Sequence, residues 1–418
     1  MPGLGPSTSD ASDVIVVGGG IVGCSAAAFL AGAGARVTLI EIADVAAGAS
    51  GRNSGVVQHP FDRALRDLHL ETLAGYRELA AEADLDFGIG PDPAGLLLVA
   101  LAADGPRAVA TALRDTWPEL DPVFIDGADL RRVEPGLAPE VAACFVPIGY
   151  PVPPAAATRA YAVLARRRGA RIATGVGAAA VVLGSHDRAG GRVSGVRLTD
   201  GRVLAAGSVL VAAGPWSPAL LDPTGRWRPI RPFWGVVADV GLADPPRHIL
   251  EESGMEEALI GVDRASAPVA ADAGTASDRS PSHGRRADGP DANGDRPDFS
   301  LVTALGRSSL GSTFLADEPD ARAWVPRLVA RGRRFVPAIA DAPIVSVRAC
   351  ARPLSVDERP LLGAVPGMPG VFVAAGHGPW GISTGPASAR LVAAAILGEQ
   401  VTIPAELDAA RFGSPGAG

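Results

Sequence analysis

Three glycines near the start of the chain have the spacing that binds a dinucleotide. Gly18, Gly20 and Gly23 form the pattern G-x-G-x-x-G directly after the apolar run 14–17. The first glycine allows a tight turn, the second lets the backbone approach a pyrophosphate, and the third lets a helix pack against the strand. Ile21 and Val22 lie between the last two glycines, where the start of that helix attracts phosphate oxygens, and are expected to line the same site.

Glu41 adds a carboxylate at the end of the next expected strand, 36–40. A carboxylate there can accept hydrogen bonds from both hydroxyls of an adenosine ribose and would repel a 2′-phosphate, so the ligand is expected to be FAD or NAD and not NADP. The uncharged stretch 14–35 is also long enough to span a bilayer. Its glycines and the order of strand, turn, helix, strand and acid favour dinucleotide binding instead.

A small polar loop at residues 48–55 follows this unit. It has little bulk and many N–H donors, so it can pass close to a flat ring or a diphosphate, although an ordinary surface loop is the alternative. A second approach to the nucleotide is expected where the apolar run 209–213 ends in a glycine turn, unless that run is only a core strand. The expected cofactor contacts in these two segments are Ser50, Gly51, Arg52, Asn53, Ser54, Gly55, Gly214 and Trp216.

Two arginines lie on one face of an extended segment, 344–352, which Pro353 is expected to end. Strand alternation places Arg348, Cys350 and Arg352 on the same side. An arginine aimed into a cavity would bind a carboxylate in a bidentate manner. The alternative is that both arginines are surface charges or pair with internal acids.

A third glycine turn precedes the last helix, which is expected at 383–397. The helix N-terminus could stabilise negative charge on a reduced ring. The turn supplies the candidate cofactor contacts Gly376, His377, Gly378, Trp380, Gly381 and Ile382.

The elements that must position these residues alternate along the chain. Helical spacing is expected at 24–33, 65–83, 106–114, 126–134, 155–168 and 322–336. Strands are expected at 95–101, 170–174, 191–198, 202–211, 233–240, 300–305, 308–314 and 371–376. Residues 1–12 and the low-complexity insertion 264–298 lack the apolar content to offset their chain entropy and are expected to be disordered.

Composition narrows the function classes. The 418 residues are 47% hydrophobic, enough for two domains, and the net charge of −7 without a basic block argues against nucleic acid or an anionic membrane as a partner. All 38 basic side chains are arginines, which excludes a Schiff-base lysine or an oxygen-activating lysine. Cys24, Cys144 and Cys350 lack metal spacing, so no metal site is expected, and they fit a reducing cytoplasm. No signal peptide or membrane span is expected.

Taken together, these segments resemble the FAD-dependent amino-acid and amine oxidases, the group of glycine oxidase, D-amino-acid oxidase and monomeric sarcosine oxidase. The most specific pieces are 14–41, 48–55, 212–217, 301–314 and 351–398, which includes RPLSVDERPLLG and AAGHGPWGISTGPASARLV. The resemblance implies an α/β fold with a Rossmann-like FAD-binding domain, interleaved with an α+β substrate domain built on a large antiparallel sheet. The FAD-binding domain is expected at 13–90, 145–220 and 345–410, and the substrate domain at 91–144 and 221–344.

The resemblance also implies roles. Arg352 would hold the carboxylate of a small amino acid (a D-amino acid, glycine, an N-methyl or a cyclic amino acid) while hydride passes to flavin N5. The imine would then hydrolyse to an oxo acid. Arg348 and His377 are the further catalytic candidates, and both Arg352 and His377 would also lie against the flavin. FAD is expected to be bound without a covalent link, with a thioether to Cys350 as the alternative.

The chain departs from the family pattern at several places. Pro379 or Trp380 stands where relatives carry a second cation, and Ser300 where they often carry tyrosine. Arg348, Gln58 or His59 could supply the missing polar contacts. The electron acceptor is expected to be oxygen or another acceptor. A 2-hydroxy-acid oxidase or dehydrogenase, and a flavin subunit that assembles with a partner chain, remain alternatives, as does an oligomer.

Overall fold

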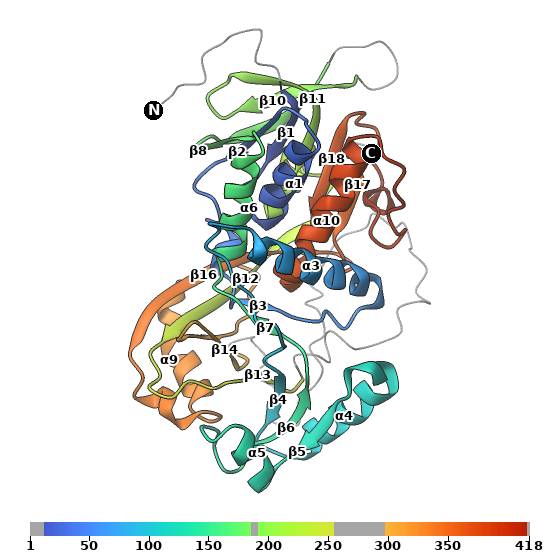
Figure 1. Ribbon diagram of the computed structural model, residues 1–418. Helices are drawn as coiled ribbons and strands as arrows, with labels where there is room; N and C mark the ends of the chain where they lie inside the picture. Colours follow the sequence, from blue (N-terminus) through green and yellow to red (C-terminus); the bar gives the residue numbers. More distant parts are fainter. Residues whose placement is uncertain (1–11, 185–190, 255–296, 416–418) are drawn as a thin grey trace.

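The computed structural model describes residues 12–184, 191–254 and 297–415, which form two large sheets connected by long strands (Figure 1). The expected leader and most of the expected insertion lie outside the described residues, but Ser12 already belongs to the first strand. Among the described helices, none is both long and apolar enough to cross a bilayer.

The first sheet has a parallel core. Its strands run in the order β17 (Leu361–Ala364), β18 (Val371–Ala375), β11 (Val203–Val211), β1 (Ser12–Val17), β2 (Val37–Glu41) and β8 (Arg171–Thr174). Only β17 is antiparallel on this path. Strands β10 (Val193–Leu198) and β9 (Ala178–Leu183) extend β11 with antiparallel pairs. Because β1 is buried by elements on both sides of the sheet, its side chains form an unbroken apolar run instead of alternating.

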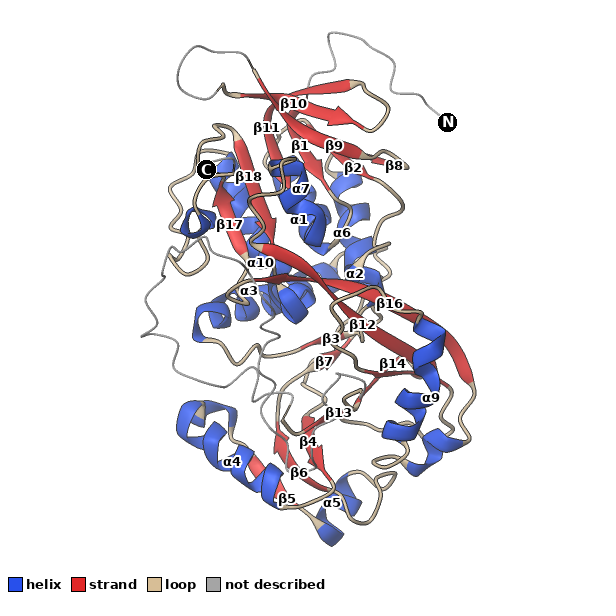
Figure 2. Cartoon of the chain, turned by 180° about the vertical axis from the view of Figure 1, so that it is seen from behind, coloured by secondary structure: helices blue, strands red, loops and turns tan. Residues whose placement is uncertain are grey.

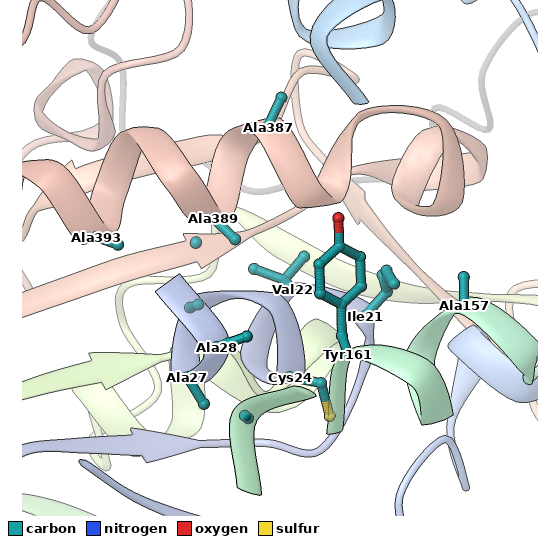
Figure 3. Close-up of a cluster of buried hydrophobic side chains, with 14 of the residues drawn as sticks. Ile21, Val22, Cys24, Ala27, Ala28, Ala157, Tyr161, Ala387, Ala389 and Ala393 are labelled. Carbon is teal, nitrogen blue, oxygen red and sulfur yellow. The ribbon is translucent and has the colours of Figure 1, made fainter. Parts of the chain in front are cut away.

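Four helices pack together at one face of this sheet: α1 (Ile21–Gly32), α3 (Arg63–Ala81), α6 (Ala156–Arg167) and α10 (Gly381–Ile396). Small side chains let them approach closely, and Figure 3 shows Ala389 and Ala393 of α10 facing Val22 and Ala28 of α1. This packing fixes where the N-termini of α1 and α10 lie relative to the sheet.

The second sheet is antiparallel apart from one parallel pair, β13 with β4. Its strands are ordered β16 (Ile344–Ser355), β12 (Ile230–Val240), β15 (Arg307–Gly311), β14 (Ser300–Ala304), β13 (Ile249–Glu252), β4 (Leu96–Ala100), β6 (Ala142–Val146) and β5 (Val123–Ile125). Helix α9 (Ala321–Gly332) packs on one face, α4 (Asp104–Thr116) packs on the other, and α5 (Gly127–Val133) lies near the far end (Figure 2).

Several short elements complete the fold. They are α2 (Ala49–Arg52), β3 (Val56–Val57), β7 (Tyr150–Pro151), α7 (Ser217–Leu221) and the 3₁₀ turns η1 (Pro118–Leu120), η2 (Gly214–Trp216), η4 (Pro337–Ala340), η5 (Gly378–Trp380) and η6 (Ala409–Phe412). Strand β3 pairs with β7 just before Gln58, which places that residue between the two sheets.

The expected fold class is confirmed, but several local expectations were wrong. The loop at 48–55 contains the short helix α2, because Asn53 ties its own amide back to the carbonyl groups of Ala49 and Ser50. Pro353 does not end its strand, since β16 continues to Ser355 as an edge strand, where a proline without an N–H is tolerated. In addition, strands β3, β5, β6, β7, β9, β13 and β17 were not expected.

The segment boundaries of the two expected domains stay a prediction. Strand β16 lies, except for Ile344, within the third segment assigned to the FAD-binding domain, yet it pairs with β12 along most of its length and therefore belongs to the second sheet.

Candidate cofactor and substrate site

Three glycine turns lie at the carboxyl ends of neighbouring parallel strands. Gly18 follows β1, Gly214 lies just beyond β11, and Gly376 follows β18, three strands that are adjacent in the order β18-β11-β1. In open parallel sheets, ligands bind outside the carboxyl ends of the strands. The three turns that the sequence indicated separately therefore come together at one edge.

The first turn is too tight for any residue except glycine at two positions. A Cβ atom on Gly18 would lie 2.4 Å from the carbonyl oxygen of Ala212, and Gly18 has a φ of +113°. A Cβ atom on Gly23 would lie 1.9 Å from the carbonyl oxygen of Gly18. These contacts bring the N-terminus of α1 against the end of the strand, the geometry that receives a pyrophosphate.

Two side chains hold this turn from its flank. Glu41 accepts a hydrogen bond from the Gly19 N–H at 2.6 Å and another from the Ala43 N–H at 2.9 Å. Ser50 accepts one from the Ile21 N–H at 2.9 Å, replacing the cap that Gly20 cannot provide. The carboxylate of Glu41 thus lies beside the turn, where an adenosine ribose would be bound, and the loop 48–55 is attached to the first turn of α1.

The rest of that loop is organised by backbone contacts. Asn53 accepts a hydrogen bond from the Gly55 N–H at 2.8 Å, and Gly51 packs so closely that a Cβ atom there would lie 2.2 Å from the Ala46 carbonyl oxygen. Arg52 reaches the carbonyl oxygen of Ala349 in β16 at 3.5 Å, and Ser54, two residues later, is half-buried. The loop therefore lies between the first glycine turn and the second sheet.

The guanidinium group of Arg348 is hydrogen-bonded to the backbone of this loop. Its Nη1 atom lies 2.6 Å from Oδ1 of the buried Asp239, while Nε and Nη2 donate to the carbonyl oxygens of Arg52 and Asn53 at 3.2 and 3.0 Å. The charge of Arg348 is therefore balanced by an internal acid, which is one of the alternatives that the sequence left open for this arginine. A role for Arg348 in substrate binding stays a prediction.

Arg352 has a different environment. Its guanidinium lies over Gly235, where a Cβ atom would come within 2.3 Å of Nη2, and its Cζ atom is 4.9 Å from the centre of the Phe314 ring. Nη1 donates to the Thr313 carbonyl oxygen at 2.9 Å and Nη2 to Ser312 Oγ at 2.8 Å. Within the described part of the chain Arg352 makes no ion pair, so its charge is available to a ligand anion.

His377 is buried at the third glycine turn, with 2% of its surface exposed. Its backbone bridges to Leu354 of β16, close to Arg352 in sequence. Burial lowers the pKa of His377 to about 4, so the ring is neutral at pH 7. Its Nε2 atom is buried and, among the described residues, has no hydrogen-bond partner, which leaves it free for a bound group.

The remaining candidates from these turns divide into core and exposed positions. Trp380 and Ile382 belong to the apolar core beneath α10, whereas Trp216 is 56% exposed next to the second turn. A groove between α1, α3, α6 and α10 is lined by Glu71, Tyr161 and Arg390 among others and contains none of the expected site residues. The expected residues therefore gather at the strand ends and not at this groove.

Sequence reasoning did not identify Glu251, because strand β13 was not expected. Gln58, which it did name, donates from Nε2 to Glu251 Oε2 at 3.1 Å, and the Gln58 N–H donates to Ser383 Oγ at 2.9 Å. The nearby His59 ring contacts Trp117 and His69. Gln58 thus connects the start of α10 with the second sheet.

The residues at the strand ends fit FAD. The glycine cradle, the carboxylate of Glu41 and the N-terminus of α1 suit the adenosine diphosphate part, and the buried Nε2 of His377 suits a polar edge of the ring system. Among the described residues no group of three His, Cys, Asp or Glu side chains could hold a metal ion.

Comparison with known proteins agrees with this fit. The chain is 26% identical over 413 residues to the uncharacterised oxidoreductase YurR of Bacillus subtilis, covering 96% of this chain and 98% of that one. Its fold resembles glycine oxidase from Geobacillus kaustophilus, with a TM-score of 0.75, 23% identity and coverage of 98% and 99% of the two chains. It also resembles iminodiacetate oxidase from Chelativorans sp. BNC1, with a TM-score of 0.71, 23% identity and coverage of 96% and 98%. The family model described as DAO, FAD dependent oxidoreductase, matches residues 13–395, so the chain belongs to the DAO family of FAD-dependent oxidoreductases.

Proposed function

We propose that this flavoprotein oxidises the C–N bond of a small amino acid, with Arg352 holding the substrate carboxylate. The observation that carries the proposal is the uncompensated charge of Arg352 beside the third glycine turn. Bound FAD supplies the chemistry of hydride acceptance. The structural neighbours named above, a glycine oxidase and an iminodiacetate oxidase, support an amino-acid substrate.

The geometry of Arg352 suits a carboxylate clamp. Two nitrogen atoms of its guanidinium are already fixed by Thr313 and Ser312, so the group is oriented before any substrate arrives. A guanidinium has five N–H donors, which leaves three for a ligand. A carboxylate held there would have a restricted orientation, so the carbon that loses hydride would be held in one position relative to the flavin.

Arg348 and Arg352 differ in whether an acidic side chain neutralises them. Both arginines lie on β16 with the same strand parity, but Asp239 neutralises only Arg348. We therefore assign Arg348 to positioning the loop 48–55 and Arg352 to the substrate. We further propose that the oxidised compound is a D-amino acid, glycine, an N-methyl or a cyclic amino acid, and that the enzyme works in the cytoplasm, where its three free cysteines would stay reduced.

The test compares Arg352→Gln with Arg322→Gln, which changes an exposed arginine on α9. Unreactive carboxylates are titrated into each holoprotein, and binding is followed by the change in the flavin absorption bands. Loss of a charge-assisted, bidentate contact costs about 3–5 kcal/mol, so the Arg352 variant should bind roughly 10²-fold more weakly or worse. Equal affinity in both variants, at full FAD content, would show that Arg352 is not the clamp.

A further inference from the structure

A second polar group lies across the sheet from Arg352. Glu251 on β13 accepts a hydrogen bond from Gln58, and Gln58 is itself held by Ser383 at the start of α10. Only 3% of the Gln58 surface is exposed, and its buried Oε1 atom has no hydrogen-bond partner among the described residues. The cluster therefore presents two acceptors, the carboxylate of the half-buried Glu251 and the amide oxygen of the buried Gln58.

Strand register shows that Glu251 faces the same way as Arg352. Glu251 is opposite Ser300, and Ser300 is opposite Gly311, so these three residues share one face. The alternate face is formed by Leu250, Leu301, Leu310, Ala238 and Val347, which pack in or against the core beneath α9.

Arg352 is on the face away from that core. It has the same parity as Arg348, whose side chain reaches the loop 48–55, and opposite parity to Val347. The Arg352 guanidinium is hydrogen-bonded to Ser312, the residue after Gly311. From there to β13 the sheet is two strands wide, so the cationic and acidic groups are separated by roughly 10 Å.

This separation suits a ligand with opposite charges at its ends. A carboxylate on Arg352 and a donor on Glu251 each need a hydrogen-bond distance of about 3 Å, which leaves a span of a few bonds between them. An ammonium or similar cation carries only donors and would satisfy both Glu251 and the free Oε1 of Gln58. An apolar end group would leave the Gln58 oxygen buried without a donor.

We propose that Glu251 and Gln58 bind a second, positively charged nitrogen of the substrate, so that the preferred substrate is a cationic amino acid. This inference rests on the proposed function, because it takes Arg352 as the carboxylate clamp. It names the substrate class that the departures from the family pattern leave open, and it assigns the specificity to residues from β13 and the segment after β3.

The ionisation of Glu251 should make the binding of a cationic substrate depend on pH. Glu251 keeps part of its surface open to solvent, yet desolvation of its carboxyl group raises the pKa to about 7, against the lowering effect of the Gln58 hydrogen bond. The residues opposite it on β4 and β14, Leu98 and Ser300, carry no charge. The nearby histidines His59 and His69 have pKa values lowered to about 4 by burial.

On the other face of β13, Glu252 is already paired with Arg331. Glu251 therefore becomes negative as the pH rises through about 7, and cation binding should strengthen over the same interval. A neutral substrate should show no such gain from this carboxylate.

The experiment measures anaerobic flavin reduction of the holoprotein by matched pairs of amino acids. Lysine and ornithine are compared with norleucine and norvaline, as both enantiomers, between pH 6 and 8.5. The wild-type protein should prefer the cationic member in kcat/KM by about 10–100-fold, and the preference should grow through pH 7. Glu251→Gln should lose the preference and its pH dependence, while Glu318→Gln, an exposed control, should keep both.

Gln58→Met provides a second variant that removes the free acceptor and keeps the carboxylate, and it should reduce the preference as well. FAD content confirms that each variant is folded. Reduction by neutral amino acids with no preference for cationic ones would overturn this inference and leave the proposed function standing. If no amino acid of either kind reduces the flavin, both are overturned.

Discussion

Removing the charge of Asp239 should destabilise the protein and weaken FAD binding together. The Asp239 side chain is only 2% exposed and accepts hydrogen bonds from Arg348 at 2.6 Å, Ser346 at 2.7 Å and Ser309 at 3.0 Å. In Asp239→Asn the side chain keeps its shape, but the Arg348 guanidinium loses its counter-charge while largely buried.

The magnitude follows from the cost of leaving one partner of a buried pair. Breaking such a pair costs about 3–5 kcal/mol. Because the amide can still accept hydrogen bonds, we expect the free energy of unfolding to fall by about 3 kcal/mol. Arg348 also holds the carbonyl groups of Arg52 and Asn53. A less ordered loop at 48–55 must be ordered again on binding, so the dissociation constant for FAD should rise by roughly tenfold, or about 1.4 kcal/mol.

The assay combines urea unfolding, followed by circular dichroism, with FAD retention after ultrafiltration. Asp244→Asn is the matched control, because Asp244 is exposed and its change should stay within about 0.5 kcal/mol. Burial alone would raise the pKa of Asp239, but the bonds from Arg348, Ser346 and Ser309 lower it below its ordinary value of 3.8. The stabilisation is therefore present above pH 3.8 and is lost as the pH falls through the lowered pKa. An Asp239→Asn protein with wild-type stability and FAD affinity at pH 7 would show that the buried pair of Asp239 and Arg348 does not hold the loop 48–55.

Three further predictions concern the cofactor site. Gly23→Ala should abolish FAD binding or folding, because the added Cβ would lie 1.9 Å from the Gly18 carbonyl oxygen, and the flavin content of the purified variant measures this. Acid precipitation of the wild-type protein should leave the flavin in the supernatant, whereas flavin in the pellet that disappears in Cys350→Ser would establish a thioether link. The free energy of unfolding should fall as the pH is lowered from 6.5 to 4, because burial lowers three histidine pKa values to about 4 and protonation then favours the unfolded chain. The loss is roughly 2 kcal/mol for each ring at pH 5. Thermal unfolding across this interval should show a falling melting temperature, and a constant melting temperature would contradict the prediction. These rings are His59, His69 and His377.

The parts of the site that could be predicted from sequence are those whose signal is local. The glycines at 18, 20 and 23 and the acid at 41 lie within one strand–helix–strand unit, so their spacing alone indicates how they meet. Strand alternation likewise placed Arg348 and Arg352 on one face of β16.

The parts that could not be predicted depend on pairings distant in sequence. Asp239 is 109 residues from Arg348, and Glu251 is 193 residues from Gln58, so the local sequence around each residue does not indicate its partner. Strand β13 is only four residues long, too short for an alternation pattern to distinguish it from a loop. Which arginine keeps a free charge therefore became clear only from the packing of the sheet.

An amino acid held by Arg352 is expected to reduce the flavin of this protein. The most direct measurement is the anaerobic visible spectrum of the holoprotein while glycine, sarcosine, proline, and neutral and cationic amino acids of both hands are added, followed by air. We predict that at least one amino acid bleaches the flavin band in the wild-type protein and fails to do so at the same concentration in Arg352→Gln. A flavin band that no amino acid bleaches would show that this protein is not an amino-acid oxidoreductase, and a band bleached equally well in the variant would show that Arg352 does not hold the substrate.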